Sequence, residues 1–408
     1  MKRIYAVLFS TLVFFGCEKS PDLQEGIWRA TLKTESGAEV PFNFELRDSA
    51  GTKNIYLLNG RERLKANQLQ IEGDSVFIEM PLFETEIRAK LTSSGLKGQW
   101  LKHLADRVVK MPFNAQPNAS WRFFKKKTPA RYSVAGRWSA IFSSTDGKDT
   151  TIAIGEFAQN DEEVTGTFLT ATGDYRFLQG SINGDKLFLS AFDGSSAYLF
   201  SGILQNDSVI TDGLFYSGLN SVKNWSANRD EQAMLPDAYS LTTLKAGHDT
   251  LHFSFPDLNG NPVSLSDDRF KNKVVILQFL GSWCPNCMDE TAFLVPFYQK
   301  YNPRGVEIIG LAYERTNDTA QSRKILTKFR ERFNVNYPIL ITGFTNKEVL
   351  HSMPALNDFK AFPTTILIDK KGRVRNIHTG FSGPGTGEHY NAFIEDFEKQ
   401  VKQLLNEP

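Results

Sequence analysis

Short apolar runs separated by turn residues dominate the first half of the chain, from about Gln24 to Asp230. The run KLFLS at 186–190 follows the turn residues NGD at 183–185, and the run SVFIE at 75–79 follows GD. Asn-Gly and Gly-Asp pairs ahead of such runs indicate β-hairpins. Helical periodicity is weak throughout this half, so we expect it to be all-β, built as barrels or sandwiches.

The pattern changes at Leu251, where apolar strands begin to alternate with helical segments. The run KVVILQFL at 273–280 is almost wholly apolar, as expected of a buried central strand. One helical pattern then runs from Met288 to about Tyr301, and a second, charged one covers 319–333. This alternation predicts an α/β domain over residues 251–408, joined to the β half by a linker at 233–250.

The β-rich half also repeats itself. The string GIWRA at 26–30 returns as GRWSA at 136–140, and LQIEGDSVFI at 69–78 returns as QGSINGDKLFL at 179–189. Both matches have an offset of roughly 110 residues, which argues for two related β units. We expect unit 1 at residues 25–127 and unit 2 at residues 128–232. They would form either two small barrels or sandwiches, or the two halves of one larger barrel.

The N-terminus has the pattern of an export signal. The positive residues Lys2 and Arg3 precede an apolar stretch at 4–15 that is too short to span a bilayer, and a small residue then precedes Cys17. Residues 1–16 resemble a bacterial lipoprotein signal peptide, which is cleaved so that the cysteine thiol carries the lipid. Residues 17–24 would then form a tether. Ordinary secretion is the alternative. Both interpretations place the protein in the periplasm or cell envelope, and the lipoprotein interpretation also anchors it to a membrane by its lipid.

Charge and cysteine counts narrow the classes of function. The 408 residues include 47 Lys and Arg against 46 Asp and Glu, so no charge imbalance points to nucleic acid. Of the three cysteines, one stands at the lipidation point and two form a Cys-x-x-Cys pair. No cysteines remain for a structural disulfide, so the stability of the protein must come from its hydrophobic cores.

The Cys-x-x-Cys pair, Cys284-Pro285-Asn286-Cys287, lies between the predicted central strand and the predicted helix. Two thiols three positions apart at a helix start can close a disulfide within one turn. The first thiol also meets the unpaired N–H groups and the positive end of the helix, which stabilise its thiolate. Cys284 is therefore the expected nucleophile and Cys287 the resolving thiol, by a route that needs no metal and no cofactor.

These residues resemble the thioredoxin fold. Trp283 precedes the pair, and the segment FPTT at 362–365 matches the family's cis-proline loop. The segment FPDLNGNPVSL at 255–265 resembles the lead-in of the TlpA/ResA-like branch of thiol–disulfide oxidoreductases. The resemblance covers about Leu251 to Leu405 and implies that Pro363 is cis and lies beside the disulfide. It also implies that the substrate chain is contacted by Trp283, Pro285, Phe362 and Pro363.

One departure from the family concerns the proton acceptor. Thioredoxins carry a buried acid six residues before the first cysteine, where this chain has Gln278, and a neutral amide cannot accept the proton of Cys287. Glu314 is our candidate for another base. It follows the apolar strand at 306–313, and ligand sites of parallel sheets collect at strand C-termini. The alternatives for Glu314 are an exposed loop carboxylate or a salt-bridge partner of Arg315.

Two functions of different classes remain open. In the first, the protein exchanges disulfides with thiol- or disulfide-bearing exported proteins. The TlpA/ResA-like resemblance favours reduction, with electrons from an unidentified membrane donor. In the second, the β half recognises a ligand or partner, and the thioredoxin-like domain reports redox state without turnover. Under the first hypothesis the β half is either a recognition module or a spacer. A zinc site, a peroxiredoxin-type peroxidase and a purely structural disulfide fit the motif less well.

Overall fold

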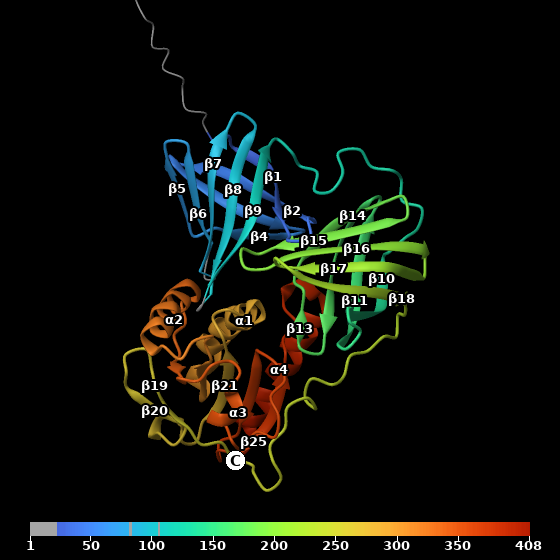
Figure 1. Ribbon diagram of the computed structural model, residues 1–408. Coiled ribbons are helices and arrows are strands. Elements are labelled where there is room, and N and C mark those ends of the chain that lie inside the picture. The colour runs from blue at the N-terminus through green and yellow to red at the C-terminus, as the bar shows by residue number, and fades with distance from the viewer. Residues whose placement is uncertain (1–22, 81–83, 105–106) are drawn as a thin grey trace, which may run out of the picture.

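The computed structural model describes residues 23–80, 84–104 and 107–408. The predicted signal peptide, the predicted lipidation residue Cys17 and most of the predicted tether lie outside the described residues. Two β units lie side by side at one end of the molecule, and a mixed α/β domain forms the other end (Figure 1). Within the described ranges, no helix is both long and apolar enough to cross a membrane.

Unit 1 is an open half-barrel of nine antiparallel strands in the order β4-β3-β2-β1-β9-β8-β7-β6-β5. Strands that follow one another in the chain pair, except β4 and β5, which form the two edges of the sheet, and β1 also pairs with β9 and so joins the two ends of the unit. The predicted hairpin at Gly73-Asp74 joins β5 to β6. The strands are β1 (Gly26–Lys33), β2 (Glu39–Ser49), β3 (Thr52–Asn59), β4 (Glu62–Lys65), β5 (Gln68–Glu72), β6 (Ser75–Glu79), β7 (Thr85–Thr92), β8 (Gly95–His103) and β9 (Val108–Pro117).

Unit 2 is a closed barrel of eight strands with the short β13 added at its edge, because β11 pairs with β12 as well as with β10. Its interior is filled by aromatic rings; Phe200 and Phe215, for example, stack with their centroids 4.3 Å apart. The strands are β10 (Gly136–Ser144), β11 (Thr150–Asn160), β12 (Glu163–Thr170), β13 (Gly173–Asp174), β14 (Leu178–Asn183), β15 (Lys186–Phe192), β16 (Ala197–Asn206), β17 (Val209–Ser217) and β18 (Ser221–Arg229).

Matching positions in the two units support the predicted repeat. Gly26 and Gly136 begin β1 and β10 with φ of 108° and 111°, values that favour glycine. Trp28 and Trp138 each donate their indole N–H to the backbone oxygen four residues earlier, at 2.9 and 2.8 Å, and both side chains are buried. The prediction of an all-β half built as barrels is confirmed, but the two units differ in closure, since one is a half-barrel and the other a closed barrel.

The difference in closure arises because unit 2 completes the core of unit 1. Phe192 and Leu199, on the β15–β16 hairpin, belong to the buried cluster inside the half-barrel. The ring of Phe192 lies 4.4 Å from that of Phe42, centroid to centroid. Arg122, from the segment between the units, is buried and donates to the backbone oxygen of Ser190 at 3.2 Å. The open side of the half-barrel is thus filled by a hairpin in place of its own strands.

The C-terminal domain has a five-stranded sheet in the order β23-β22-β21-β24-β25, in which β21, β22 and β23 run parallel and β24 and β25 antiparallel to their neighbours. This is the thioredoxin-like arrangement that the sequence predicts. Its elements are β19 (Ser254–Pro256), β20 (Pro262–Ser264), β21 (Val274–Leu280), α1 (Pro285–Tyr301), β22 (Val306–Ala312), α2 (Thr319–Phe333), β23 (Ile339–Ile341), α3 (Val349–Ser352), β24 (Thr364–Ile368), β25 (Val374–Thr379) and α4 (Glu388–Asn406).

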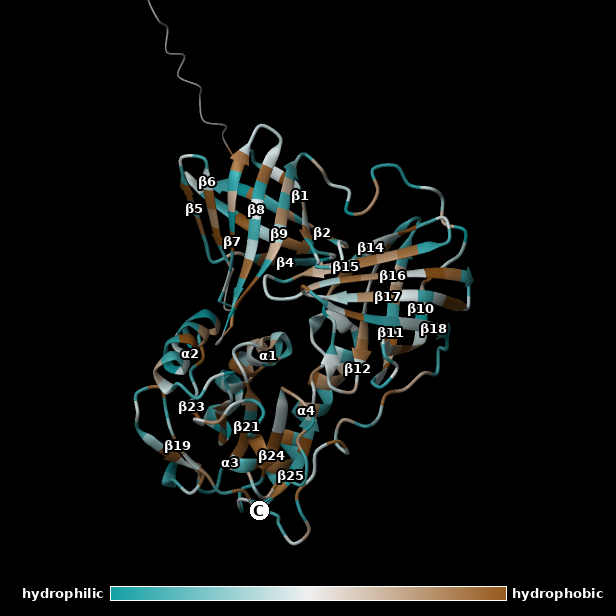
Figure 2. Cartoon of the chain, viewed as in Figure 1, coloured by the Kyte–Doolittle hydropathy of each residue, from teal (hydrophilic) through white to brown (hydrophobic). Residues whose placement is uncertain are grey.

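The strand β21 is buried along its whole length, as its unbroken apolar run predicts. Its alternate residues face two cores: Val274 and Ile276 pack with helices α1, α2 and α4, whereas Val275 and Leu277 pack on the opposite side of the sheet. Figure 2 shows the hydrophobic central strands between more hydrophilic helices, of which α2 is the most hydrophilic. This packing fixes the C-terminal end of β21, from which the Cys-x-x-Cys segment emerges.

Candidate active site

Cys284 is the N-cap residue of α1, and its sulfur accepts the backbone N–H of Cys287 at 3.2 Å. Helix α1 begins at Pro285, three residues earlier than the sequence pattern indicates, because proline suits the first helical position and the thiol caps the helix. Both cysteines are present as free thiols and both are buried. The helix N-terminus therefore presents a hydrogen-bond donor and a positive dipole to the sulfur of Cys284.

Three of the four predicted substrate-contacting residues, Trp283, Phe362 and Pro363, lie near this sulfur. The Cys284 thiol donates to the backbone oxygen of Phe362 at 3.6 Å, and the Phe362–Pro363 bond is cis, as predicted. Trp283 packs edge-on against Phe362, with ring centroids 5.4 Å apart, and its indole N–H donates to the backbone oxygen of Tyr313 at 2.9 Å. The backbone oxygen of Pro285, the fourth predicted residue, accepts a hydrogen bond from Arg176 of the β half at 3.4 Å.

Cys287 lies deeper and in more negative surroundings. Burial raises the pKa of its thiol well above the ordinary value, and the hydrogen bond and negative charge of Cys284 and the charge of Glu290 raise it further. Glu290 lies one turn further along α1 and is itself buried. Burial raises the pKa of Glu290 to about 7, although hydrogen bonds from Thr365 and Gln278 oppose the shift. A carboxyl group that titrates near neutrality thus lies within electrostatic reach of Cys287.

A buried hydrogen-bond network fixes the position of Glu290. The amide of Gln278 donates to the Glu290 carboxylate at 2.9 Å, and the hydroxyl of Thr365 donates to its other oxygen at 2.6 Å. The hydroxyl of Tyr337 in turn donates to the amide oxygen of Gln278 at 3.1 Å. Gln278 does not replace the missing acid of thioredoxins, but it holds the acid that is present.

Glu314, the base proposed from the sequence, is engaged elsewhere. Its carboxylate accepts the backbone N–H of Ser282 at 2.9 Å and the Ser282 hydroxyl at 2.7 Å. Burial raises its pKa, and the Ser282 hydrogen bonds and the charge of Arg315 oppose the shift. Glu314 is buried, so it is not the exposed loop carboxylate of the alternative reading. Its contacts order the loop before Cys284, and a catalytic role for it stays a prediction.

Sequence reasoning missed Glu290, although a signal was available. The residues 287, 290, 294 and 297 recur at helical spacing, and three of them are Cys, Leu and Phe. Such a face is buried, and all four of these side chains are buried in the structure. A carboxylate on the buried face of a helix, one turn after the second cysteine, is therefore a candidate proton acceptor for that cysteine.

The β half contacts the same motif. Arg176, from the segment between β13 and β14, donates to the Asp289 carboxylate of α1 at 2.6 Å and to the backbone oxygen of Pro285 at 3.4 Å. Its other guanidinium nitrogen donates to Glu62 of unit 1 at 2.6 Å. Burial raises the pKa of Asp289 to about 7 while the charge of Arg176 opposes the shift. One arginine thus joins both β units to the active-site helix.

The fold and the capped pair of thiols define a thiol–disulfide oxidoreductase of the thioredoxin-like class. The family model for Redoxin matches residues 245–394. The ResA thiol–disulfide oxidoreductase of Bacillus subtilis (strain 168) is 30% identical over 138 residues, 34% of this chain and 69% of the relative. The ResA protein of Geobacillus kaustophilus (strain HTA426) is 33% identical over 139 residues, which are 34% of this chain and 72% of the relative. A solved thioredoxin domain of a Bacteroides vulgatus thiol–disulfide oxidoreductase is 26% identical. The match covers 38% of this chain and 99% of the solved one, with a TM-score of 0.29.

The chain belongs to the family of ResA thiol–disulfide oxidoreductases. The matched region is the C-terminal domain, and the β half extends beyond it.

Proposed function

We propose that this protein reduces disulfide bonds in exported proteins while a lipid on Cys17 holds it at a membrane surface. The observation that carries the proposal is the arrangement of Cys284 at the N-terminus of α1 above the buried Cys287. The positive residues, short apolar stretch and cysteine at the N-terminus support export and lipid attachment. Reduction would consume electrons, which we expect from a membrane donor.

The reaction follows from the surroundings of the two sulfurs. The Cys284 thiolate attacks one sulfur of the substrate disulfide, which breaks that bond and releases the other sulfur as a thiolate that takes up a proton. Cys287 then loses its proton and attacks Cys284, which releases the second substrate thiol and leaves the Cys284–Cys287 disulfide. Two electrons and two protons pass to the substrate. Trp283, Phe362 and Pro363 border Cys284 and would contact the substrate chain.

The proton of Cys287 needs an acceptor because burial and negative charge disfavour its thiolate. We assign this role to Glu290, whose pKa of about 7 lets it accept a proton in the neutral range. Glu314 would act as a positioning residue that holds Ser282, and hence the loop that leads to Cys284.

The reduction potential of the Cys284–Cys287 pair tests the direction of electron flow. Equilibration of residues 23–408 with dithiothreitol or glutathione buffers, followed by Trp283 fluorescence, gives the potential, and Cys284→Ser is the control. The motif class spans about −270 to −120 mV, and we expect a value near the reducing end. A value near the oxidising end would make the protein a disulfide donor. The absence of any reversible two-electron transition would refute the proposal that the Cys284–Cys287 pair exchanges disulfides.

Removing the resolving thiol tests the order of attack. In Cys287→Ser, Cys284 can still attack a substrate disulfide but the mixed disulfide cannot be resolved, so we expect it to accumulate and to be detectable by non-reducing electrophoresis and mass spectrometry. Cys284→Ser should give no adduct. Adducts through Cys287 in that variant would reverse the assigned roles.

A further inference from the structure

A short loop of unit 2 lies beside the nucleophile. This loop, residues 171–176, carries β13 and lies next to α1 in Figure 1. A Cβ atom on Gly173 would lie 1.9 Å from the side-chain nitrogen of Asn286, the third residue of the Cys-x-x-Cys motif. The loop therefore touches the motif itself, two residues after Cys284.

The same loop also borders the cis-proline segment. A Cβ atom on Gly380 would lie 2.9 Å from the carbonyl carbon of Thr172. Gly380 donates its N–H to the backbone oxygen of Pro363 at 2.8 Å. Pro363 follows Phe362, whose backbone oxygen accepts the thiol of Cys284. Only 5% of the surface of Cys284 is exposed, so a loop in this place limits what can approach the sulfur.

The loop fits closely because glycines of the α/β domain leave room for its backbone. Besides Gly380, Gly385 approaches it, since a Cβ atom on Gly385 would lie 2.9 Å from the backbone carbonyl carbon of Arg176. Two carbon atoms pack at about 3.5 to 4.0 Å, so a side chain at either glycine would displace the loop. The segment 380–385 thus forms a contact surface that accepts the loop only in its present place.

Hydrogen bonds and an ion pair hold the loop against this surface. In addition to the ion pair of Arg176 with α1, the Asp174 carboxylate accepts the N–H of Gly383 at 2.7 Å. Arg61 of unit 1 donates to the backbone oxygen of Pro384 at 2.8 Å, so unit 1 contacts the same segment. Both β units therefore help to fix the loop beside the nucleophile.

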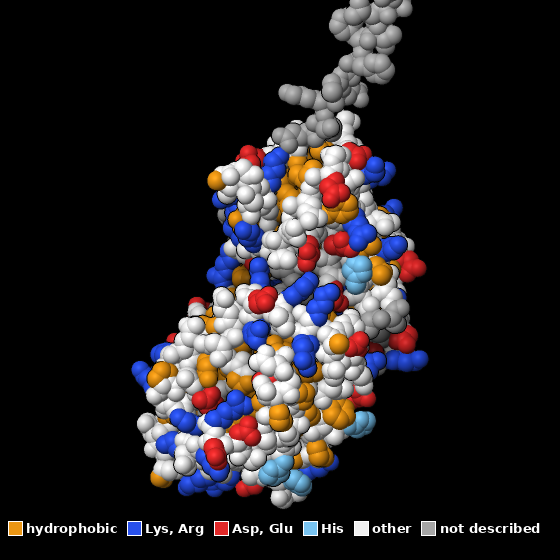
Figure 3. Space-filling model, turned by 90° about the vertical axis from the view of Figure 1, so that its left-hand side faces the viewer, with side chains coloured by type: hydrophobic (Ala, Val, Ile, Leu, Met, Phe, Trp, Pro, Cys, Tyr) orange, Lys and Arg blue, Asp and Glu red, His pale blue; other side chains and the backbone are white. Residues whose placement is uncertain are grey.

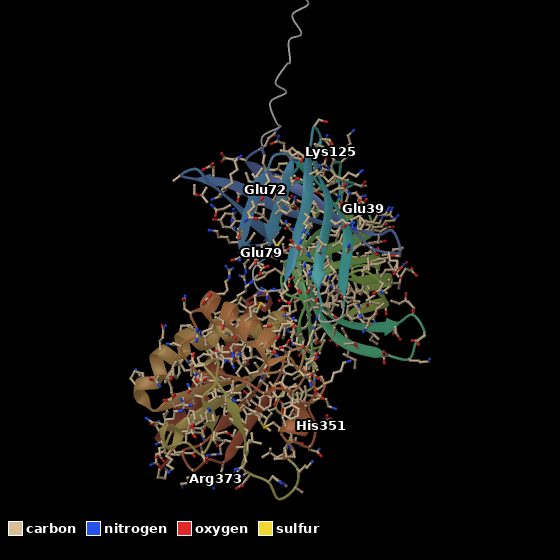
Figure 4. All side chains as sticks on the ribbon, turned by 60° about the vertical axis from the view of Figure 1, so that its left-hand side comes forward. Glu39, Glu72, Glu79, Lys125, His351 and Arg373 are labelled. Carbon is tan, nitrogen blue, oxygen red and sulfur yellow. The ribbon has the colours of Figure 1, made fainter. Side chains whose placement is uncertain are left out.

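The junction between the β half and the α/β domain is polar. Among the residues that the structure describes, no hydrophobic cluster joins these two parts of the protein. Figure 3 shows Lys and Arg side chains gathered where the two ends of the molecule meet. Figure 4 shows Glu79 on the side of unit 1 that faces the α/β domain and Arg373 at the far end of that domain. The loop can therefore be altered by single substitutions that leave every hydrophobic core intact.

We propose that the loop 171–176 is a specificity-determining element of the active site, which keeps folded proteins away from Cys284 and leaves the sulfur open to disulfides in flexible segments of polypeptide. The proposal rests on the proposed function and deepens it, because it names the class of substrate. A folded protein meets the loop before its disulfide reaches the sulfur, whereas a flexible segment can bend around the loop. The β half then selects substrates by their size and is not a spacer.

Rates of reduction by the pre-reduced full-length chain with Cys17→Ser test this selection. Two probes carry the same mixed disulfide with 2-mercaptoethanol. In one it is on a surface cysteine of a small folded carrier protein, and in the other on an unstructured peptide copied from the sequence around that cysteine. Each rate is divided by the rate at which dithiothreitol reduces the same probe, which removes differences in the reactivity of the probes themselves. We expect the peptide to react about tenfold faster than the folded carrier on this scale.

Substitutions in the loop and at its contact surface should change this ratio of peptide to carrier rates in opposite directions. Thr172 is exposed, and Thr172→Trp enlarges the loop, so the ratio should rise about fivefold. Gly385→Ala pushes the backbone of the loop away from its contact surface, so the ratio should fall towards one. Ser208→Trp adds the same bulk to the exposed β16–β17 turn, at the other end of the barrel, and should leave the ratio unchanged.

Equal scaled rates for the peptide and the folded carrier, or a ratio that Thr172→Trp does not raise, would overturn the proposal. Hydroxyethyl disulfide is small enough to pass the loop and tests the proposed function separately. The parent chain and its three variants should reduce it at similar rates. Failure of the parent chain to reduce hydroxyethyl disulfide would instead overturn the proposed function.

Discussion

At the scale of single residues, the two thiols of the active site differ in their electrical surroundings. Cys284 caps a helix and accepts the N–H of Cys287, whereas Cys287 is buried beside the negative charge of Glu290. A thiolate is therefore stabilised at the first sulfur and opposed at the second. Under the proposed mechanism, this asymmetry favours Cys284 as the attacking thiol and leaves Cys287 in need of an acceptor for its proton.

Glu290→Gln should change the pH dependence of stability. The folded-state pKa of Glu290 is about 7 against a reference of 4.5, so the folded state retains a proton that the unfolded state loses. The stabilisation is fully present below the reference pKa and is lost as the pH rises through 7, a loss of about 3 kcal/mol. Urea denaturation at about pH 4 and pH 8 should show this extra loss in the unsubstituted protein and not in Glu290→Gln. Equal losses in both proteins would contradict the assigned pKa.

The place of Cys284 at the start of the helix could be predicted from the sequence, but the buried carboxylate of Glu290 one turn after Cys287 could not. In a Cys-x-x-Cys at a strand-to-helix junction, the first sulfur can accept the backbone N–H of the second cysteine. This cap depends only on residues three positions apart, so the sequence alone predicts it. The choice between Glu314 and Glu290 depends on which carboxylate is held near Cys287 by its hydrogen-bond partners. Ser282, Gln278 and Thr365 supply those partners, and they lie on different elements whose packing no local pattern reveals.

At the scale of elements, alternation and turn signals predicted what each segment becomes. The charged pattern at 319–333 gives α2 with the same bounds, and the repeat appears as equivalent strands in both units. What the pattern did not reveal is that one copy stays open and the other closes. That outcome depends on Phe192 and Leu199, which are buried in the core of unit 1. The sequence pattern would be the same if they were buried in unit 2, to which they belong.

Phe192→Ala should destabilise a unit to which the residue does not belong. Its side chain is fully buried against Phe42 and Trp100 of unit 1, so truncation should cost about 3–5 kcal/mol. Hydrogen–deuterium exchange should rise in β2 and β8. Ile152→Ala, at a position that is 56% exposed, is the matched control and should have little effect on either measure. Faster exchange confined to unit 2 would argue against the shared core.

At the scale of the whole molecule, Arg176 ties the β half to the catalytic domain. It contacts Glu62 of unit 1 and Asp289 of α1 while belonging to unit 2 itself. Such an ion cluster is stable only when every member is present, because a buried charge left without a partner is costly. The position of the β half above the active site is therefore specified by charge as well as by shape.

Arg176→Gln should destabilise the protein by about 3–5 kcal/mol, because it leaves Asp289 and Glu62 facing each other without a cation. The cost should grow as the pH rises through about 7, where Asp289 loses its proton. Thermal unfolding at about pH 6 and pH 8 measures both effects, and adding Asp289→Asn should restore part of the stability. Arg131→Gln, which removes a guanidinium that is 67% exposed, serves as the control. A pH-independent cost would show that Asp289 is not the partner that matters.

The hairpin that fills the half-barrel also sets the timing of folding. A chain is synthesised from its N-terminus onward. All nine strands of unit 1 therefore emerge before Phe192 and Leu199, which occupy their apolar interior. Until the hairpin follows, the nascent sheet keeps an exposed apolar surface, and we expect a holding chaperone to bind it. The first unit to be made is thus not the first that can finish folding.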